Sequence, residues 1–304
     1  MILDKNDRTQ YGIPYQGSKT KLVEKIAKFF PKADHFYDLF GGGFSVSHYM
    51  IKHRSKSFKT FHYNELRPGL CELIQDSIAG KYNYDVFKPK WISKERFDAE
   101  KETDIYIKII WSFGNNGHGY LFGPENELYK KSMHQAVIFD EFDDVMKEKF
   151  GLDRWPNHLT ILGKRLFLRR VIKNRKGELQ QLERLQRLER LQRLHFTNKS
   201  YDEVDIKDNS VIYCDPPYQG TGDYGNSFSH KKFFDWASDQ KNPVFISEYD
   251  IKDDRFYLLK TFSHRTSFSQ SDNSKVIEKL YGNKVAYKII RDALNSGKNS
   301  IGSN

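Results

Sequence analysis

Cysteine is scarce in this chain, and several other features that would restrict its class are missing. Only two cysteines occur among 304 residues, Cys71 and Cys214, far apart and without the spacing of metal ligands. A disulfide framework and a metal site are therefore not expected, and a reducing compartment fits. No stretch approaches the ~20 apolar residues of a membrane span. The first ten residues, MILDKNDRTQ, contain no apolar signal region. We expect a cytoplasmic protein without a membrane partner.

Positive charge and aromatic rings, by contrast, are abundant. Lysine and arginine number 50 against 40 aspartate and glutamate residues, so the formal net charge is +10. This balance favours a polyanionic partner, nucleic acid before membrane. Aromatic residues make up 15% of the chain, and nucleic-acid bases stack on such rings. The length suits one large domain or two ordinary ones.

The order of the predicted elements indicates an α/β domain that is split by an insertion. A β–turn–α–β unit comes first, preceded by a helix at 21–30, with strands at 35–40 and 58–65 and a helix at 44–55. Strand patterns return at 210–214, 243–249 and 284–290 (KVAYKII), and the last is predicted to close the sheet. Residues 68–176 are less regular, with helix-like pieces at 102–113 and 140–150.

The segment Asp215-Pro216-Pro217-Tyr218 directly follows the apolar run 211–214. Each proline fixes φ near −65° and restricts the residue before it. The carboxylate of Asp215 and the carbonyl of Pro216 are therefore expected to stand rigidly at the end of a strand. Two such acceptors suit an NH2 group, and the face of Tyr218 suits a planar ring. The alternative is a plain turn that ends a strand.

A glycine-rich turn, DLFGGGFS at 38–45, follows the strand at 35–40. Glycines at this place allow a tight turn and a close approach of a ligand to the backbone. Glu65 ends the next strand, where an acid commonly binds the two hydroxyls of a ribose. An ordinary turn and a solvated strand end are the alternatives. Together with Asp215, these acidic strand ends indicate a cofactor crevice.

The segment GIPYQGSKT at 12–20 approaches the pattern of a phosphate-binding loop without matching it. Gly12 and Gly17 have the right separation, but Ser18 precedes Lys19 and no apolar strand comes before the segment. Hydrolysis of a nucleoside triphosphate is therefore disfavoured. Tyr15 and Lys19 would still suit the ring and the charged end of a cofactor.

Four motifs in this order resemble the DNA adenine-N6 methyltransferases of the Dam type, the D12 class of alpha-group amino-methyltransferases. The motifs are YQGSKTKL at 15–22, DLFGGGFS at 38–45, the acid Glu65, and DPPY at 215–218. The resemblance implies a Rossmann-like S-adenosylmethionine-dependent methyltransferase sheet with an inserted, mostly helical target-recognition domain. It implies site-specific methylation of N6 on an adenine flipped out of double-stranded DNA.

The resemblance also assigns roles to individual residues. The residues implied to border S-adenosylmethionine are Tyr15, Lys19, Asp38, Phe40, Gly41, Gly42, Gly43, Glu65 and Asp215. Asp215, Pro216, Pro217 and Tyr218 would form the catalytic motif, with Tyr218 stacked on the flipped base. The chain departs from the family where Tyr15 replaces a usual Trp and where Arg67 stands in place of a frequent Asn.

The segment SFGNNG at 112–117 resembles the loop with which the recognition domain of this family meets DNA. The aromatic residue expected inside that loop is Asn115 here, which leaves insertion into the duplex open. We expect base contacts from Asn115, Asn116 and His118. Phosphate contacts are expected from the basic residues Lys130, Lys131, Arg165, Arg169 and Arg170.

Leucine recurs every third residue from Leu179 to Leu194 in LQQLERLQRLERLQRL. Leucines three residues apart step by about −60° around an α-helix, so six would wrap nearly around it. A single amphipathic face and a heptad coiled coil are therefore not expected. An over-wound helix buried on several sides, or a small solenoid of stacked turns, remains. We expect 1–69 and 195–304 to form the catalytic domain, 70–178 the recognition domain and 179–194 a Leu-rich spacer.

Three other functions remain open at the level of sequence. Methylation of adenine in structured RNA would use a related motif, although the large insertion between the cofactor and catalytic motifs disfavours it. Methylation of cytosine N4 more often goes with Ser in place of Asp215. A DNA-binding regulator on an inactive methyltransferase scaffold would bind cofactor without transferring a methyl group. We expect a monomer or weak dimer, with a cognate restriction endonuclease as a candidate partner.

Overall fold

The computed structural model describes residues 10–171, 177–189, 191–218, 228–265 and 275–296. The chain forms two compact units, which are described separately below. The first unit comprises Met1–Tyr11, Lys19–Cys71 and Gln192–Asn304, and the second comprises Gly12–Ser18 and Glu72–Leu191.

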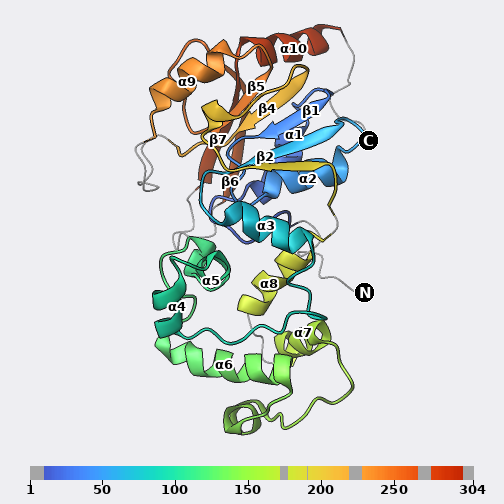
Figure 1. Cartoon of the computed structure of the whole chain (residues 1–304), viewed down its shortest axis with the longest axis vertical. Helices are drawn as coiled ribbons and strands as arrows, with labels where there is room; N and C mark the ends of the chain where they lie inside the picture. Colours follow the sequence, from blue (N-terminus) through green and yellow to red (C-terminus); the bar gives the residue numbers. More distant parts are fainter. Residues whose placement is uncertain (1–9, 172–176, 190, 219–227, 266–274, 297–304) are drawn as a thin grey trace. The chain divides into compact units, whose positions relative to one another are not determined.

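A sheet of seven strands, counted among the described residues, forms the centre of the first unit (Figure 1). Its strands are β1 (His35–Asp38), β2 (Thr60–Asn64), β3 (Leu194–Thr197), β4 (Ser210–Cys214), β5 (Val244–Glu248), β6 (Tyr257–Arg265) and β7 (Lys275–Gly282). Their order is β3-β2-β1-β4-β5-β7-β6. Strands β1 to β5 pair in parallel, whereas β7 is antiparallel to β5 and β6. The predicted Rossmann-like sheet is confirmed.

The strand order reverses between β1 and β4, because the chain runs outward through β2 and β3 and then returns to the other side of β1. In open α/β sheets, ligands bind at such a switch point, beyond the carboxyl ends of the parallel strands. Asp38 is the last residue of β1, and Asp215 follows the last residue of β4. Both acids therefore lie at the reversal.

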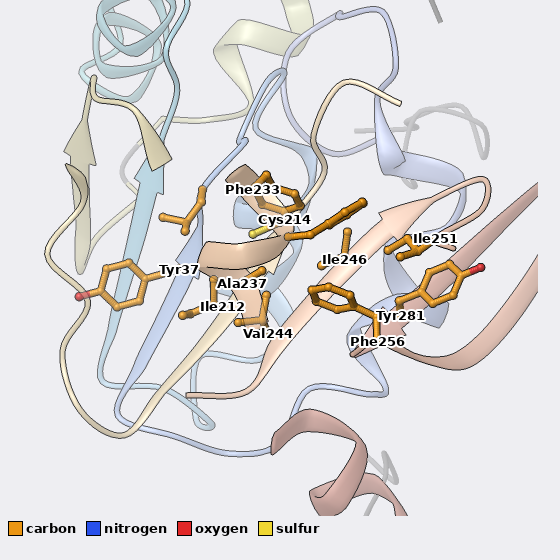
Figure 2. Packing of buried hydrophobic residues seen from close by; sticks show 12 residues of the cluster. Tyr37, Ile212, Cys214, Phe233, Ala237, Val244, Ile246, Ile251, Phe256 and Tyr281 are labelled. Atoms are coloured by element: carbon orange, nitrogen blue, oxygen red, sulfur yellow. The ribbon is translucent and has the colours of Figure 1, made fainter. Parts of the chain in front are cut away.

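Helices cover the two faces of this sheet because strand side chains alternate in direction. On one face, α9 (His230–Asp239) contributes Phe233 and Ala237 to a cluster with Ile212 and Cys214 of β4. Figure 2 shows the sulfur of Cys214 inside this cluster. Burial raises the pKa of the Cys214 thiol well above its usual value, as suits a structural thiol.

The opposite face is packed with aromatic rings near α1 (Val23–Ala27) and α2 (Ser45–His53). The ring of Phe30, just after α1, lies 5.4 Å from Phe36, 5.6 Å from Tyr213 and 5.1 Å from Phe245. These three partners come from β1, β4 and β5, so one ring ties the central strands to the helical layer. Two short 3-10 helices, η1 (Lys19–Lys21) and η4 (Tyr201–Glu203), complete the unit.

The prediction of a closing strand at 284–290 is wrong, because α10 (Lys284–Asn295) occupies this segment. The side chain of Asn283 caps the helix by accepting the N–H of Ala286. Ala286 and Ile290 are buried four residues apart, which is the helical period. The sheet ends instead with β6 and β7, and α10 packs against β5, β6 and β7.

Three histidines form a row across β1, β2 and β3. The ring of His62 stacks on Tyr37 at 4.1 Å and on His195 at 4.9 Å, and lies 5.6 Å from His35. Burial, with the neighbouring His195 and His35, lowers the pKa of His62 to about 4. Because an unfolded histidine titrates near 6.5, the unfolded chain binds this proton first as the pH falls.

We therefore expect His62 to lower the stability of the first unit as the pH falls from about 6.5 toward about 4. Urea unfolding at pH 7.5 and pH 5 measures the loss. The variant His62→Gln, which has no titrating ring, is expected to lose less stability between the two pH values than the wild type. Equal losses in both proteins would contradict this assignment.

The second unit is mostly helical. Its helices are α4 (Lys94–Glu100), α5 (Ile105–Ile110), α6 (Pro124–Phe139), α7 (Ile161–Val171) and α8 (Glu178–Gln186), with most of α3 (Leu70–Ile78) and the shorter turns η2 (Phe113–Asn115) and η3 (Val145–Lys149). The only strand-like pairing among its described residues is an isolated bridge between Ser112 and Tyr120. The predicted helical character of the insertion is confirmed.

The leucine-rich segment is an ordinary helix followed by other structure, which corrects the expectation of an over-wound helix or solenoid. Leu179, Leu182 and Leu185 are buried in α8, a helix of nine residues. The two steps of about −60° between these three leucines span only about 120°, so a single face of the helix is enough. Helix α8 ends at Gln186, and Leu194 already belongs to β3. The segment 179–194 is therefore not one element.

Among the described residues, no helix combines the length and the apolar character needed to cross a membrane.

Candidate active site

A buried lysine with two carboxylates stands at the switch point of the sheet. Lys19 Nζ lies 2.8 Å from Asp215 Oδ2 and 3.6 Å from Glu278 Oε1. The lysine is 8% exposed and Glu278 is 5% exposed. The second oxygen of Asp215, Oδ1, is buried and accepts no hydrogen bond of ordinary length from the described residues, although the nearby hydroxyl of Tyr218 helps to lower the pKa of Asp215. A buried acceptor without such a hydrogen bond is costly, which marks this atom as a candidate ligand contact.

The electrostatics of the cluster follow from burial and from the shared lysine. Burial raises the pKa of Asp215 to about 6, with Lys19 lowering it and Glu278 raising it. The pKa of Lys19 is raised because the attraction of both carboxylates outweighs the cost of burying its charge. Lys19 therefore stays protonated at neutral pH. The lysine of the near phosphate-loop motif is engaged by acids, which argues against a triphosphate site.

Asp38 lies at the end of β1 and is fixed from α2. Its Oδ2 accepts hydrogen bonds from Ser47 N at 3.1 Å and Ser47 Oγ at 2.7 Å. Burial, together with the negative charges of Asp215 and Glu65, raises the pKa of Asp38 to about 7, although the hydrogen bonds from Ser47 lower it. The acids that the sequence predicts at the strand ends are thus close enough to influence one another.

Glu65 follows β2 and closes the glycine turn. Its Oε2 accepts the N–H of Gly42 and its Oε1 accepts the N–H of Arg67, both at 2.8 Å. Burial raises the pKa of Glu65, while these backbone donors lower it. Each oxygen keeps a further lone pair for a hydroxyl. Gly42 adopts a φ of 46°, a left-handed conformation that favours glycine here.

The packing of the fold explains why position 41 is a glycine. A Cβ at this position would lie 2.1 Å from Cε2 of Tyr63, whose hydroxyl donates to the carbonyl of Gly42 at 2.6 Å. The space beside Gly41 is therefore filled by the Tyr63 ring. The sequence prediction that the glycines admit a ligand stays untested for Gly42 and Gly43.

We expect Gly41→Ala to lower the free energy of unfolding by about 1–3 kcal/mol, because the ring of Tyr63 must move. Gly119→Ala is the control, since nothing lies within 4 Å of its Cβ position. Chemical denaturation of both variants checks the prediction. A control variant that loses as much stability as Gly41→Ala would contradict it.

The DPPY segment is held from both sides. The carbonyl of Pro217 accepts a hydrogen bond from His230 Nε2 at 2.8 Å. The ring of Tyr218 lies 5.0 Å from Lys19 Nζ and packs edge-on against Tyr249 at 4.5 Å. The lysine that contacts Asp215 thus also orients the ring of Tyr218.

Phe40 lies in the hydrophobic layer beside α9. Its ring stacks on Tyr201 at 5.5 Å and meets Phe233 edge-on at 5.5 Å. These contacts anchor the glycine-rich turn to the hydrophobic core. A contact between Phe40 and the cofactor remains a proposal.

Tyr15 belongs to the second unit, with the rest of 12–18. Arg184 of α8 donates to the carbonyls of Gly12 and Ile13, and Gln16 N donates to the carbonyl of Asn115. The predicted cofactor residues Tyr15 and Lys19 thus fall in different units, although they are four positions apart.

The predicted DNA loop presents different side chains from those expected. Asn115 Nδ2 donates to the carbonyl of Ile109 and to Gln181 Oε1, so this amide nitrogen is used within the unit. Asn116 Oδ1 accepts the N–H of His118, whose own side chain is exposed. Phe113, next to Gly114, is 61% exposed. The amide nitrogen of Asn115 is thus engaged within the unit, base contact by Asn115 stays a prediction, and the same segment exposes the aromatic ring of Phe113.

The predicted phosphate-binding residues divide into three kinds. Lys131 and Arg170 are exposed. Lys130 and Arg169 line a cavity with His134 and Gly177–Gln180. Arg165 forms a bidentate ion pair with the buried Glu183 of α8, so the charge of Arg165 is neutralised inside the unit. A phosphate would have to displace this carboxylate, so the ion pair disfavours the predicted phosphate contact of Arg165.

Sequence reasoning missed three residues of the site: Glu278, His230 and Tyr249. The available signal for Glu278 was an acid on the same strand face as the buried Leu280. For His230 and Tyr249 no pattern in the sequence connects them to the DPPY segment.

Comparison with known proteins agrees with this geometry. The family of D12 class N6 adenine-specific DNA methyltransferases matches residues 15–293. Type II methyltransferase M.FokI from Planomicrobium okeanokoites is 24% identical over 278 residues, which cover 83% of this chain and 35% of that protein. The chain thus spans about a third of the length of this curated relative.

Among solved structures, the chain is similar to a putative methyltransferase, yhhF, from Escherichia coli, and to the rRNA methyltransferase aviRa from Streptomyces viridochromogenes. The first has 9% identity and a TM-score of 0.35, and covers 90% of this chain and 92% of its own. The second has 11% identity and a TM-score of 0.40, and covers 96% of both chains.

Proposed function

Because the chain belongs to the family of D12 class N6 adenine-specific DNA methyltransferases, we propose that it methylates N6 of a flipped-out adenine at specific sites in duplex DNA. The resemblance seen in the sequence is confirmed by this membership, which implies a methyl donor of the S-adenosylmethionine type. The observation that carries the proposal is the acceptor Asp215 Oδ1, buried at the switch point beside Lys19.

The charge of the site fits S-adenosylmethionine. Asp215 and Glu278 bring two carboxylates to one ammonium, that of Lys19, and Asp38, whose pKa is raised to about 7, adds part of a third negative charge nearby. A ligand with a sulfonium and an ammonium group would balance this excess of negative charge. When bound, S-adenosylmethionine supplies a methyl group on positively charged sulfur. We propose that Glu65 binds its ribose hydroxyls and that Asp38 and Gly41–Gly43 border it.

The adenine amino group is a poor nucleophile because its lone pair is delocalised into the ring. Asp215 Oδ1 and the carbonyl of Pro216 can accept its two hydrogens, which favours a pyramidal nitrogen with an available lone pair. Acceptors fixed in advance act where positive charge develops in the transition state. Asp215 Oδ1 is also placed to take the proton that the nitrogen must lose as the N–C bond forms and the C–S bond breaks.

Tyr218 is proposed to hold the target base. A base inside a duplex cannot reach such a pocket and has to be flipped out, at a cost of a few kcal/mol. Stacking on an aromatic ring recovers about 1–3 kcal/mol per base. Lys19 and Tyr249 fix the ring beforehand, so less freedom is lost when the base arrives.

We propose that the first unit carries catalysis and that residues 70–178, nearly all of which belong to the second unit, read the DNA. Lys131 and Arg170 are exposed cations suited to phosphates, and Lys130 and Arg169 border a cavity of the same unit. A cognate endonuclease stays a proposed partner, and a monomer or weak dimer stays the proposed oligomeric state.

Phe113 is expected to contribute to DNA binding. An exposed aromatic ring can stack on or wedge between bases, so Phe113→Ala should weaken binding of duplex DNA about tenfold without loss of stability. Fluorescence anisotropy with labelled duplex measures the affinity. Leu128→Ala on α6 removes a similarly exposed apolar side chain and serves as the control. Unchanged affinity in Phe113→Ala would contradict the assignment.

The proposed substrate is tested by offering duplex DNA and total RNA with radiolabelled S-adenosylmethionine. Label in duplex DNA supports the proposal. Label only in RNA would move the substrate to structured RNA. Binding of cofactor with no transfer to either would favour a DNA-binding regulator on an inactive scaffold.

A further inference from the structure

Glu278 occupies an unusual place for a carboxylate. It lies on β7 on the same face as Leu280, which is fully buried, and is itself 5% exposed. Strand alternation would put an apolar side chain at this position. A buried acid where the pattern demands an apolar residue is most often found at a functional site.

The sheet topology explains how Glu278 reaches the site. Strand β7 runs antiparallel to β5, and its last pair at this end joins Glu248 to Lys279. Glu278 is the next residue on β7, so it extends past the carboxyl end of β5. It therefore lies at the same edge of the sheet as Asp215, although it comes from a strand of opposite direction.

Two carboxylates share one ammonium at this edge. Lys19 Nζ makes a close contact of 2.8 Å with Asp215 Oδ2 and a longer one of 3.6 Å with Glu278 Oε1. Without Glu278 the full charge of Lys19 would act on Asp215, which would become a weaker hydrogen-bond acceptor. With Glu278 present, the carboxylate of Glu278 balances part of the positive charge of Lys19.

We propose that Glu278 is a positioning residue for methyl transfer, which holds Lys19 against Asp215 Oδ2 and shares its charge so that Asp215 Oδ1 accepts strongly from the target amine. This inference rests on the proposed function. Among the described residues, the charged and titratable groups that face Asp215 are Lys19 from η1, Glu278 from β7, Asp38 from β1, and Tyr213, Cys214 and Tyr218 from its own strand and turn.

The pH dependence of the rate provides the distinguishing readout. Glu278 raises the pKa of Asp215, so removing its charge lets Lys19 lower that pKa. Glu278→Gln is therefore expected to move the acid limb of kcat to lower pH by about one unit and to lower the plateau rate about tenfold. Glu278→Asp keeps the charge and is expected to retain an acid limb near that of the wild type.

The experiment measures kcat against pH from 5 to 9 on duplex DNA, with Asp250→Asn as the control. Asp250 pairs with Lys279, the neighbour of Glu278, so this variant removes an equal charge from an exposed position. The control is expected to keep the wild-type profile. An acid limb in Glu278→Gln that matches the wild type, or a shift that Asp250→Asn reproduces, would overturn the proposal.

A second readout does not depend on activity. Competitive acetylation followed by mass spectrometry reports how readily each lysine loses its proton. At pH 9, Lys19 is expected to react about tenfold faster in Glu278→Gln than in the wild type, because one of its two carboxylates is gone. Unchanged reactivity would refute the charge sharing. A wild-type protein that transfers no methyl group would overturn the proposed function, while the acetylation result would still decide the role of Glu278 beside Lys19.

Discussion

Asp215→Ala is expected to lower the rate of methyl transfer by about 10³-fold or more. The substitution removes the acceptor that Oδ1 offers to the target amine, and no other side chain of the site replaces it in the proposed mechanism. The fold should survive, because Lys19 keeps Glu278 as its partner. Binding of S-adenosylhomocysteine by calorimetry checks that the variant still forms the cofactor site.

Asp215→Asn separates the charge of this residue from its shape. Asparagine keeps one acceptor oxygen but has no negative charge, so its rate is expected to fall between those of the wild type and Asp215→Ala. Single-turnover measurements at saturating cofactor and DNA compare the three proteins in the chemical step. Wild-type activity in Asp215→Ala would exclude the proposed role of Asp215.

Lys19→Met is expected to lower the free energy of unfolding at pH 8 by about 3–5 kcal/mol. The substitution removes the partner of Asp215 and Glu278 and leaves two buried carboxylates close together. Lys94→Met on α4 is the control, because Lys94 is exposed and its ion pair with Asp98 is long at 3.9 Å. The control should change stability by less than about 0.5 kcal/mol.

The pH dependence of Lys19→Met has a defined sign. Without the lysine, the two buried carboxylates repel each other and protonation relieves this repulsion, so the folded protein binds protons more tightly than the unfolded chain. The stability of the variant is therefore expected to recover as the pH falls from 8 to 5. Adding Glu278→Gln to Lys19→Met should restore part of the lost free energy of unfolding at pH 8, because the substitution removes one of the two uncompensated negative charges. A double variant less stable than Lys19→Met would contradict this account of the cluster.

The acids that end the parallel strands could be predicted from the sequence, and Glu278 could not. Asp38, Glu65 and Asp215 each lie at the end of a short strand pattern, and parallel strands bring their carboxyl ends to one edge. Glu278 reaches that edge only because β7 pairs antiparallel with β5. That pairing is a property of the whole sheet, so the alternation of Glu278 with Leu280 marks an acid on a buried face but does not show that it reaches the site.

Two errors of local prediction have a common cause. Residues 284–290 alternate well enough to suggest a strand, yet the Asn283 cap and the four-residue spacing of Ala286 and Ile290 favour α10. The leucine spacing suggested several buried faces, yet α8 ends at Gln186 before its leucines leave one side. In both cases a helix boundary decided the structure: the N-cap Asn283 begins α10, and α8 ends at Gln186. The hydrophobic periodicity alone does not show where a helix begins or ends.

The function of individual DNA-facing residues was the least predictable part. Asn115 and Arg165 are of the residue types that contact bases and phosphates, but their partners, Gln181 and Glu183, both come from α8. Residue type shows what a side chain can bind. Only the tertiary packing shows that it is already bound.

The nature of the methylated nucleoside in duplex DNA tests the central claim most directly. Duplex DNA incubated with the protein and S-adenosylmethionine is digested to nucleosides, which are separated and weighed by mass spectrometry. The account predicts N6-methyladenine with the wild type and its loss with Asp215→Ala. N4-methylcytosine, or unmodified DNA from a protein that binds the cofactor, would contradict it.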